Sequence, residues 1–212
     1  MQILGTWLID KGAKIGQISA LAVMLMAATT SIATAQNVCV NPVVQGAFTL
    51  DKTRLCVGSP VKIISVPGNI SNVGYNFQYN GNGFPAATVN TTTFTYTQPG
   101  SYTIIQVGSG AGLAQGTIAC QQVDVLPLGV VRATSQSCAN RVVTLTATLD
   151  GTNDKYDAYQ VNWGDGVVQS YTLAQLQARP QHTYTDSRNR TATIQGVYDA
   201  PASCGSTPFG IS

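Results

Sequence analysis

Apolar and polar residues alternate with a period of two over many short segments of this 212-residue chain. A period of two is typical of β-strands that bury one face, because successive side chains point to opposite sides of a sheet. Turn sequences rich in Gly, Asp, Asn and Pro separate these segments. The alternating segments are Tyr75–Tyr79, Phe94–Tyr96, Tyr102–Ile104, Val143–Leu149, Tyr159–Trp163 and Ala192–Tyr198. The pattern predicts an all-β protein with one short helix at Leu173–Ala178, which Pro180 ends.

A similar order of cysteines and aromatic residues occurs twice along the chain. Each copy has a cysteine, two aromatic residues four positions apart and a second cysteine: Cys56, Tyr75, Tyr79 and Cys120, then Cys138, Tyr159, Trp163 and Cys204. Spacings counted from the first cysteine differ by only two residues between the copies. We therefore predict two tandem antiparallel β-sandwich domains over 37–126 and 130–212, joined by a linker at 127–129.

The repeat also predicts a disulfide pattern. Each domain would join its early strand to its late strand, through Cys56–Cys120 and Cys138–Cys204, and Cys39 would stay unpaired. Two alternatives stay open: Cys39 replaces Cys56 as the partner of Cys120, or a free Cys39 pairs with a second chain. Bridges that close such long loops stabilise small sandwiches, whose cores are marginal.

Residues 1–35 have the pattern of a secretory signal peptide. Lys11 and Lys14 precede the apolar segment Ile18–Ala28, and small residues lead to the motif Ala33–Ala35. The apolar segment is shorter than the roughly 20 residues that a membrane-spanning helix needs. We expect cleavage after Ala35, export to the medium or the cell surface, and an oxidising environment in which disulfides form. No later segment is apolar enough to span a membrane.

Composition and charge exclude several classes of function. A net charge of +2 with 9 % charged residues gives no basic surface for nucleic acid. The chain contains no glutamate, a single histidine (His182), no G-x-S-x-G motif and no CxxC pair. We therefore predict no catalytic residue, no zinc site and no cofactor. The one metal alternative is calcium at a loop that holds Asp150, Asp154 and Asp157, although their spacing does not match an EF-hand.

The second copy resembles the signature of PKD repeats, the polycystic-kidney-disease type of Ig-like β-sandwich. In Tyr159–Gly166 an aromatic strand runs into Gly-Asp-Gly, and His182-Thr-Tyr184 before a turn and a Thr-rich strand is similar to the second hallmark of the family. The first copy has Tyr79–Gly83 in place of Gly-Asp-Gly but keeps Phe94–Tyr96. The combination is similar to secreted and surface proteins of gliding bacteria. The resemblance implies Ig-like sandwiches of about seven strands that act as spacers or adhesion units.

The motif residues have structural interpretations. They are Trp163, Gly164, Asp165, Gly166, His182 and Tyr184. Gly164-Asp165-Gly166 is expected to form a hairpin turn, Trp163 to face the core, and His182 to form a structural hydrogen bond. We expect a solvated loop cluster of Arg179, Arg188 and Arg190, which an acidic glycan would be able to contact.

These observations favour a non-catalytic extracellular structural, adhesion or interaction module whose partner is an unknown surface protein or a glycan. The alternative function is a carbohydrate-binding accessory part of a larger secreted hydrolase. Low charge and exposed sheet edges favour self-association through strand edges. The chain stops at Ser212 inside an expected strand, so we expect a longer protein that is truncated here.

Overall fold

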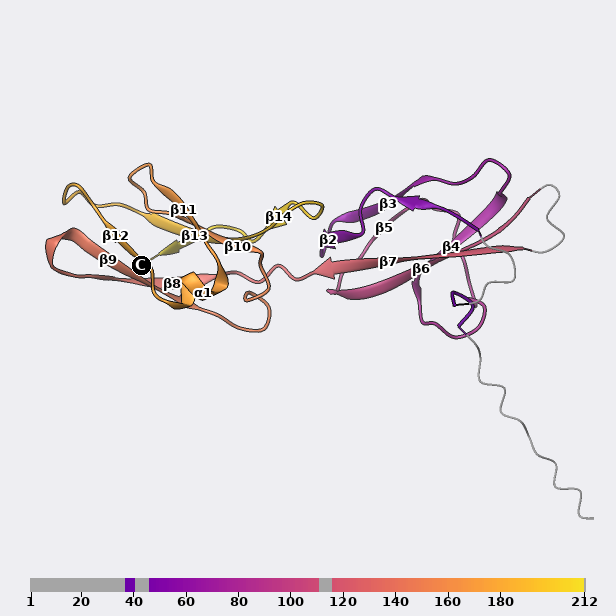
Figure 1. The fold of residues 1–212 in the computed structure, drawn as a ribbon, viewed down its shortest axis with the longest axis horizontal. Coiled ribbons are helices and arrows are strands. Elements are labelled where there is room, and N and C mark those ends of the chain that lie inside the picture. The colour runs from indigo at the N-terminus through magenta and orange to yellow at the C-terminus, as the bar shows by residue number, and fades with distance from the viewer. Residues whose placement is uncertain (1–36, 41–45, 111–115, 212) are drawn as a thin grey trace, which may run out of the picture. The chain divides into compact units, whose positions relative to one another are not determined.

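The computed structural model describes residues 37–40, 46–110 and 116–211. The predicted signal peptide at 1–35 lies outside the described residues. Two pairs of β-sheets make up the described chain (Figure 1). Residues 127–131 separate the two pairs and contain no strand.

The first pair of sheets contains seven described strands. A three-stranded sheet has the order β1-β3-β5, from β1 (Thr49–Leu50), β3 (Pro60–Ser65) and β5 (Thr93–Thr95). A four-stranded sheet has the order β2-β7-β6-β4, from β2 (Arg54–Cys56), β7 (Thr117–Leu126), β6 (Gly100–Ser109) and β4 (Ser71–Tyr79). Strand β2 runs parallel to β7, and the other pairs are antiparallel. Their shared core includes Leu55, Val61, Tyr75, Tyr96, Ile104 and Val123.

The second pair of sheets begins after residue 131. One sheet has the order β12-β9-β8, from β12 (Gln181–Thr183), β9 (Val142–Thr148) and β8 (Arg132–Ser137). In the other, β11 (Val168–Tyr171), β10 (Ala158–Asn162) and β13 (Ala192–Tyr198) lie in that order, and β14 (Cys204–Gly205) and β15 (Phe209–Ile211) both pair with β13. A 3₁₀ turn at Ala139–Arg141 precedes β9. The core includes Val131, Leu145, Tyr159, Val161, Trp163 and Ile194.

Local sequence explains most of these elements. Strand β13 alternates between buried and half-buried positions along its whole length, as a strand with one covered face does. Helix α1 (Leu173–Gln177) starts with a capping box, in which the Gln175 backbone N–H donates to Thr172 and the Gln175 side chain accepts from the Thr172 N–H. It ends before Arg179, which has a left-handed φ of 57° and precedes Pro180.

The predicted fold class, an all-β chain of Ig-like antiparallel sandwiches, is confirmed. Each alternating segment of the sequence lies within one residue of a strand of the structure. The domain boundaries at 126 and 130 stay a prediction.

The predicted disulfide pattern is wrong. The structure has Cys39–Cys120 and Cys56–Cys204, with Cα–Cα distances of 5.7 and 6.5 Å, and leaves Cys138 free and exposed. The pairs Cys56–Cys120 and Cys138–Cys204 do not occur, and Cys39 is not unpaired. Of the alternatives considered, the replacement of Cys56 by Cys39 as the partner of Cys120 is confirmed.

Strand geometry explains why the first expected pair does not form. Cys56 lies opposite Leu126 at the end of β7, whereas Cys120 is six residues earlier on β7, or about 20 Å at 3.3 Å per residue. Cys120 also lies opposite Ile105, and both pack with Cys39 in a small cluster separate from the core between the two sheets. A disulfide needs Cα atoms roughly 4.4–6.8 Å apart, so Cys56 is out of reach of Cys120.

A similar separation excludes Cys138–Cys204. Cys204 lies opposite Tyr198, whose hydroxyl donates to the Pro127 carbonyl at the start of the linker. Cys138 follows β8, a strand that starts at Arg132 near the linker, so it lies about 20 Å further along this strand. The two cysteines therefore sit toward opposite ends of the second pair of sheets.

We predict that non-reducing peptide mapping of the purified protein will yield two linked peptide pairs, Cys39–Cys120 and Cys56–Cys204. Cys138 is expected to be the only cysteine that reacts with a thiol reagent before reduction, because it is exposed and free. Recovery of a Cys138–Cys204 peptide would contradict the structure.

Candidate functional site

The Gly-Asp-Gly motif forms the turn between β10 and β11. Gly164 and Gly166 have left-handed φ values of 79° and 91°. The Val167 N–H donates to Asp165 Oδ1 (3.0 Å), which closes the turn around the aspartate. A Cβ atom on Gly164 would lie 2.6 Å from the Thr191 carbonyl oxygen, so this position has room only for glycine.

His182 connects this turn to the opposite sheet. Its ring lies parallel to the Trp163 ring at 4.8 Å, and its Nε2 is 2.7 Å from Asp165 Oδ2. The Tyr184 ring meets the imidazole edge-on at 4.7 Å, and the Tyr184 hydroxyl donates to the Trp163 carbonyl at 2.8 Å. Because His182 lies on β12 and Trp163 follows β10, this cluster joins the two sheets of the second pair. The structure thus brings together all six motif residues.

The electrostatics of the cluster suit a structural role. The His182 and Asp165 side chains are only 11 % and 14 % exposed. The hydrogen bond with His182 holds the pKa of Asp165 below its usual range. Trp163 is fully buried, and its Nε1 donates to Gln169 at 2.8 Å. A fully buried indole offers no open face for a sugar to stack on.

The acidic side chains of the calcium alternative are not brought together. Asp150 accepts three hydrogen bonds from Thr152 and Asn153 within its own loop. Asp154 pairs with Lys155, while Asp157 pairs with Arg54. Among the described residues, no three His, Cys, Asp or Glu side chains form a group that could hold a metal ion.

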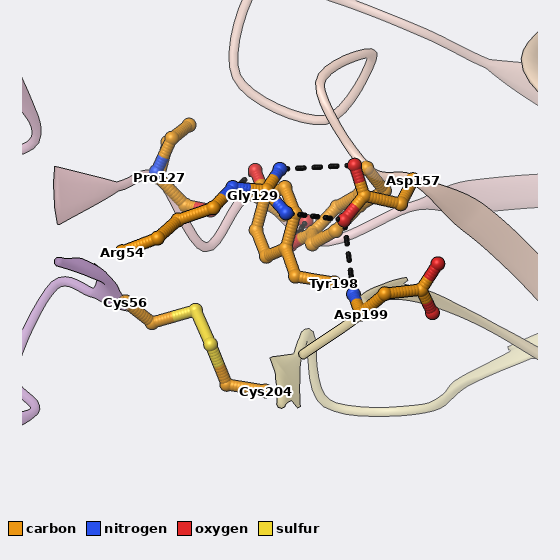
Figure 2. The surroundings of a disulfide bond; sticks show 9 residues. Arg54, Cys56, Pro127, Gly129, Asp157, Tyr198, Asp199 and Cys204 are labelled. Atoms are coloured by element: carbon orange, nitrogen blue, oxygen red, sulfur yellow. Dashed lines mark hydrogen bonds and ion pairs between the residues drawn. A yellow bond between two sulfur atoms is a disulfide. The ribbon is translucent and has the colours of Figure 1, made fainter. Parts of the chain in front are cut away.

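A second cluster, which we call the junction clamp, lies where the two pairs of sheets meet (Figure 2). Arg54 binds Asp157 through both Nη atoms, at 2.7 and 2.9 Å, and Asp157 also accepts from the Asp199 N–H at 2.9 Å. The guanidinium of Arg54 lies 5.4 Å from the centre of the Tyr198 ring. The Cys56–Cys204 disulfide lies next to this group, as Figure 2 shows.

The linker takes part in the clamp through its backbone carbonyls. The Tyr198 hydroxyl donates to Pro127 at 3.0 Å, and the Tyr156 hydroxyl donates to Gly129 at 2.8 Å. Burial raises the pKa of both tyrosines, and the hydrogen bond with Arg54 lowers that of Asp157. The clamp therefore has a single ionic state near neutral pH, with Arg54 and Asp157 charged and the tyrosines neutral.

Sequence reasoning missed the junction clamp. From the sequence, Asp157 was expected only as a possible calcium ligand, and no role was expected for Arg54. One local signal was present: Arg54 and Cys56 are two residues apart, so in a strand they share a face, opposite to the buried Leu55. The sequence does not reveal what that face meets.

In the described part of the chain, no helix is long and apolar enough to cross a membrane.

We predict that Asp165→Asn will make the stability of the protein less dependent on pH. Because the folded-state pKa of Asp165 is lowered, its carboxylate stabilises the fold above the unfolded pKa of about 3.9, and this contribution is lost as the pH falls through the folded-state pKa. Calorimetry should show the variant melting below the wild type at pH 7, by a margin that shrinks at pH 2. Asp199→Asn, at an exposed position, is the control. An equal deficit at both pH values would refute this role for Asp165.

No protein-family model matches the chain, and no curated protein sequence matches it significantly. Solved structures with a similar arrangement include fibronectin(III)-like modules of CbhA from Clostridium thermocellum, with 16 % identity, a TM-score of 0.46 and coverage of 78 % of this chain and 92 % of that chain. They also include a segment of two fibronectin type-III domains from chicken tenascin, with 10 % identity, a TM-score of 0.38 and coverage of 77 % and 95 %. Similarity at this level carries no information on what this chain binds or does.

Proposed function

We propose that this chain is a non-catalytic extracellular module that holds two β-sandwiches in a fixed relation, as a structural, adhesion or interaction part of a secreted or cell-surface protein. The observation that carries the proposal is the Cys56–Cys204 disulfide, which links cysteines 148 residues apart on the two pairs of sheets. A bond at this position limits the motion of one pair of sheets relative to the other. It does not connect the two sheets within either pair.

The interactions around the disulfide support the same interpretation. Bidentate pairing of Arg54 with Asp157 combines charge with directional hydrogen bonds, which fixes both distance and angle. Tyr198 contacts Arg54 and the Pro127 carbonyl, so one side chain ties β2 and the linker to β13. A flexible tether between independent domains would need none of these contacts.

Export is part of the proposal. Structural disulfides form and persist in oxidising compartments, and four of the five cysteines are paired. The segment 1–35, with its signal-peptide pattern, would supply the route. We further propose that the second sandwich is of the PKD type, on the basis of the Gly164–Gly166 turn and its contact with His182.

A clamped pair of sandwiches has a simple mechanical use. Without the clamp, each sandwich would rotate about residues 127–131. The loops of the two sandwiches would then seldom be oriented so that both contact the same target. The clamp removes this freedom before binding, which lowers the entropy lost when a surface protein or glycan is bound.

We predict that Cys56→Ser/Cys204→Ser will uncouple the motion of the two sandwiches. In ¹⁵N relaxation measurements, the wild type should give one rotational correlation time for both, and the variant should give shorter and unequal values. The variant should also lose about 2–5 kcal/mol of unfolding free energy in denaturant titration.

The matched control is Cys39→Ser/Cys120→Ser, which removes the bridge within the first pair of sheets. It should reduce stability but keep a common correlation time. Independent tumbling of the wild-type sandwiches would disprove the proposed function.

A further inference from the structure

A pocket of about 300 Å³ opens at one end of the second sandwich, between strands β8 and β9 and the segment 184–190. The junction clamp lies at the C-terminal end of β13, whereas this segment leads into its N-terminal end. The pocket is therefore separate from the proposed clamp, and it contains none of the six motif residues except Tyr184.

Along one face of β8, the side chains change from apolar to hydroxyl toward the pocket. Ala133 is buried in the core, but the next residues on the same face are Ser135 and Ser137. Their register confirms the face, since Ser135 lies opposite the fully buried Leu145 and Ser137 opposite Val143. Both serines are exposed, and they line the pocket together with residues 141–143 and the segment 184–190.

Three arginines border this opening: Arg141, Arg188 and Arg190. One carboxylate, Asp186, lies among them, which leaves a net charge of +2. Asp186 contacts Arg188 Nη2 at 2.6 Å and Arg190 Nη2 at 2.8 Å, and these hydrogen bonds hold its pKa far below the usual range. Asp186 thus stays ionised and orients two guanidinium groups at the rim.

The arginines are positioned by specific contacts. Arg141 has a left-handed φ of 63°, uncommon for a residue with a side chain, and its carbonyl accepts from the Tyr184 N–H at 3.0 Å. Its Nη1 donates to the Thr185 carbonyl. Arg190 is only 15 % exposed and lies over the Tyr184 ring, and its buried Nε has no hydrogen-bond acceptor among the described residues. The same guanidinium donates through Nη1 to the Gly164 carbonyl at 3.3 Å and through Nη2 to Asp186 at 2.8 Å, so the Arg190 side chain is held in place beside the pocket.

We propose that this pocket binds an acidic saccharide, namely a uronic acid or a sulfated sugar of an extracellular polysaccharide. Planar guanidinium groups match a carboxylate or sulfate in geometry as well as in charge. Ser137, Ser187 and Asn189 offer donors and acceptors to the neighbouring sugar hydroxyls, and Val143 gives a small apolar floor. The volume is at the lower end of that of small-molecule sites, which suits one sugar unit better than a folded partner.

The test is calorimetric titration of the purified protein with four probes: a galacturonate oligosaccharide, its methyl ester, a sulfated disaccharide and sodium sulfate. We expect at least one of the two acidic saccharides to bind at least tenfold more tightly than the neutral ester and than sulfate, and to lose affinity as the salt concentration rises. Binding of sulfate as tight as that of the saccharides would reduce the pocket to a simple anion site and overturn the proposal. Absence of binding by both acidic saccharides would overturn it as well.

Substitutions in the pocket test whether the acidic saccharide binds there. Arg141→Gln/Arg188→Gln should weaken the acidic saccharide at least tenfold, while Arg179→Gln, an exposed arginine that does not line the pocket, should leave affinity unchanged. Ser137→Leu keeps the charge but fills the opening, so it should also abolish binding. Unchanged affinity in both pocket variants would rule the site out. The correlation times of the two sandwiches test the clamp separately, so each hypothesis fails on its own.

Discussion

The constraint on which the rest of this structure depends is carried by the three residues of strand β2. Leu55 is fully buried in the core of the first pair of sheets, whereas Cys56 on its other side belongs to the core of the second. Because Arg54 shares a face with Cys56, one short strand delivers both a covalent bond and a bidentate ion pair to the same junction. Parallel pairing of β2 with the last residues of β7 places this face next to the linker. The junction is thus built from β-sheet register together with the linker, where a Cβ atom on Gly129 would lie only 2.8 Å from the Thr152 carbonyl carbon.

The type of residue on its inner faces decides where the second sandwich packs tightly and where it leaves a pocket. Where residues on the inner face are aromatic, as with Trp163, Tyr184 and the imidazole of His182, the two sheets are tied together. Where the same face of β8 carries the exposed Ser135 and Ser137, polar side chains of β8 and of the segment 184–190 line the pocket. Both regions use Tyr184, whose hydroxyl bonds to the Trp163 carbonyl while its ring supports Arg190. Packing of the core and placement of a cation at the surface are therefore coupled through one side chain.

The sequence predicted the strands well because alternation is local information. Segment Ala192–Tyr198 and the capped helix at Leu173 are specified by residues within a few positions of one another. The disulfides were predicted wrongly because pairing depends on which strand ends meet, and that follows from the parallel β2–β7 register, which no local pattern encodes. The assumption that a repeated sequence implies a repeated disulfide failed for the same reason. Arg188 and Arg190 were expected together in a loop cluster, but Arg141 joins them in place of Arg179 because a left-handed turn brings it there.

The contacts of the aspartates explain where arginine side chains outnumber carboxylates. The chain has nine aspartates and no glutamate, and most of the described aspartates serve the fold. Asp150 organises its loop, Asp157 binds Arg54, Asp165 binds His182, and Asp124 accepts from Ser101. These four carboxylates are each used for a local structural contact. At the opening of the second sandwich three guanidinium groups line one pocket with a single carboxylate, Asp186, which pairs with two of them. The cationic side chains that line this opening therefore exceed its acidic ones by two, and hydroxyl side chains lie beside them, which is the arrangement on which the proposed saccharide site rests.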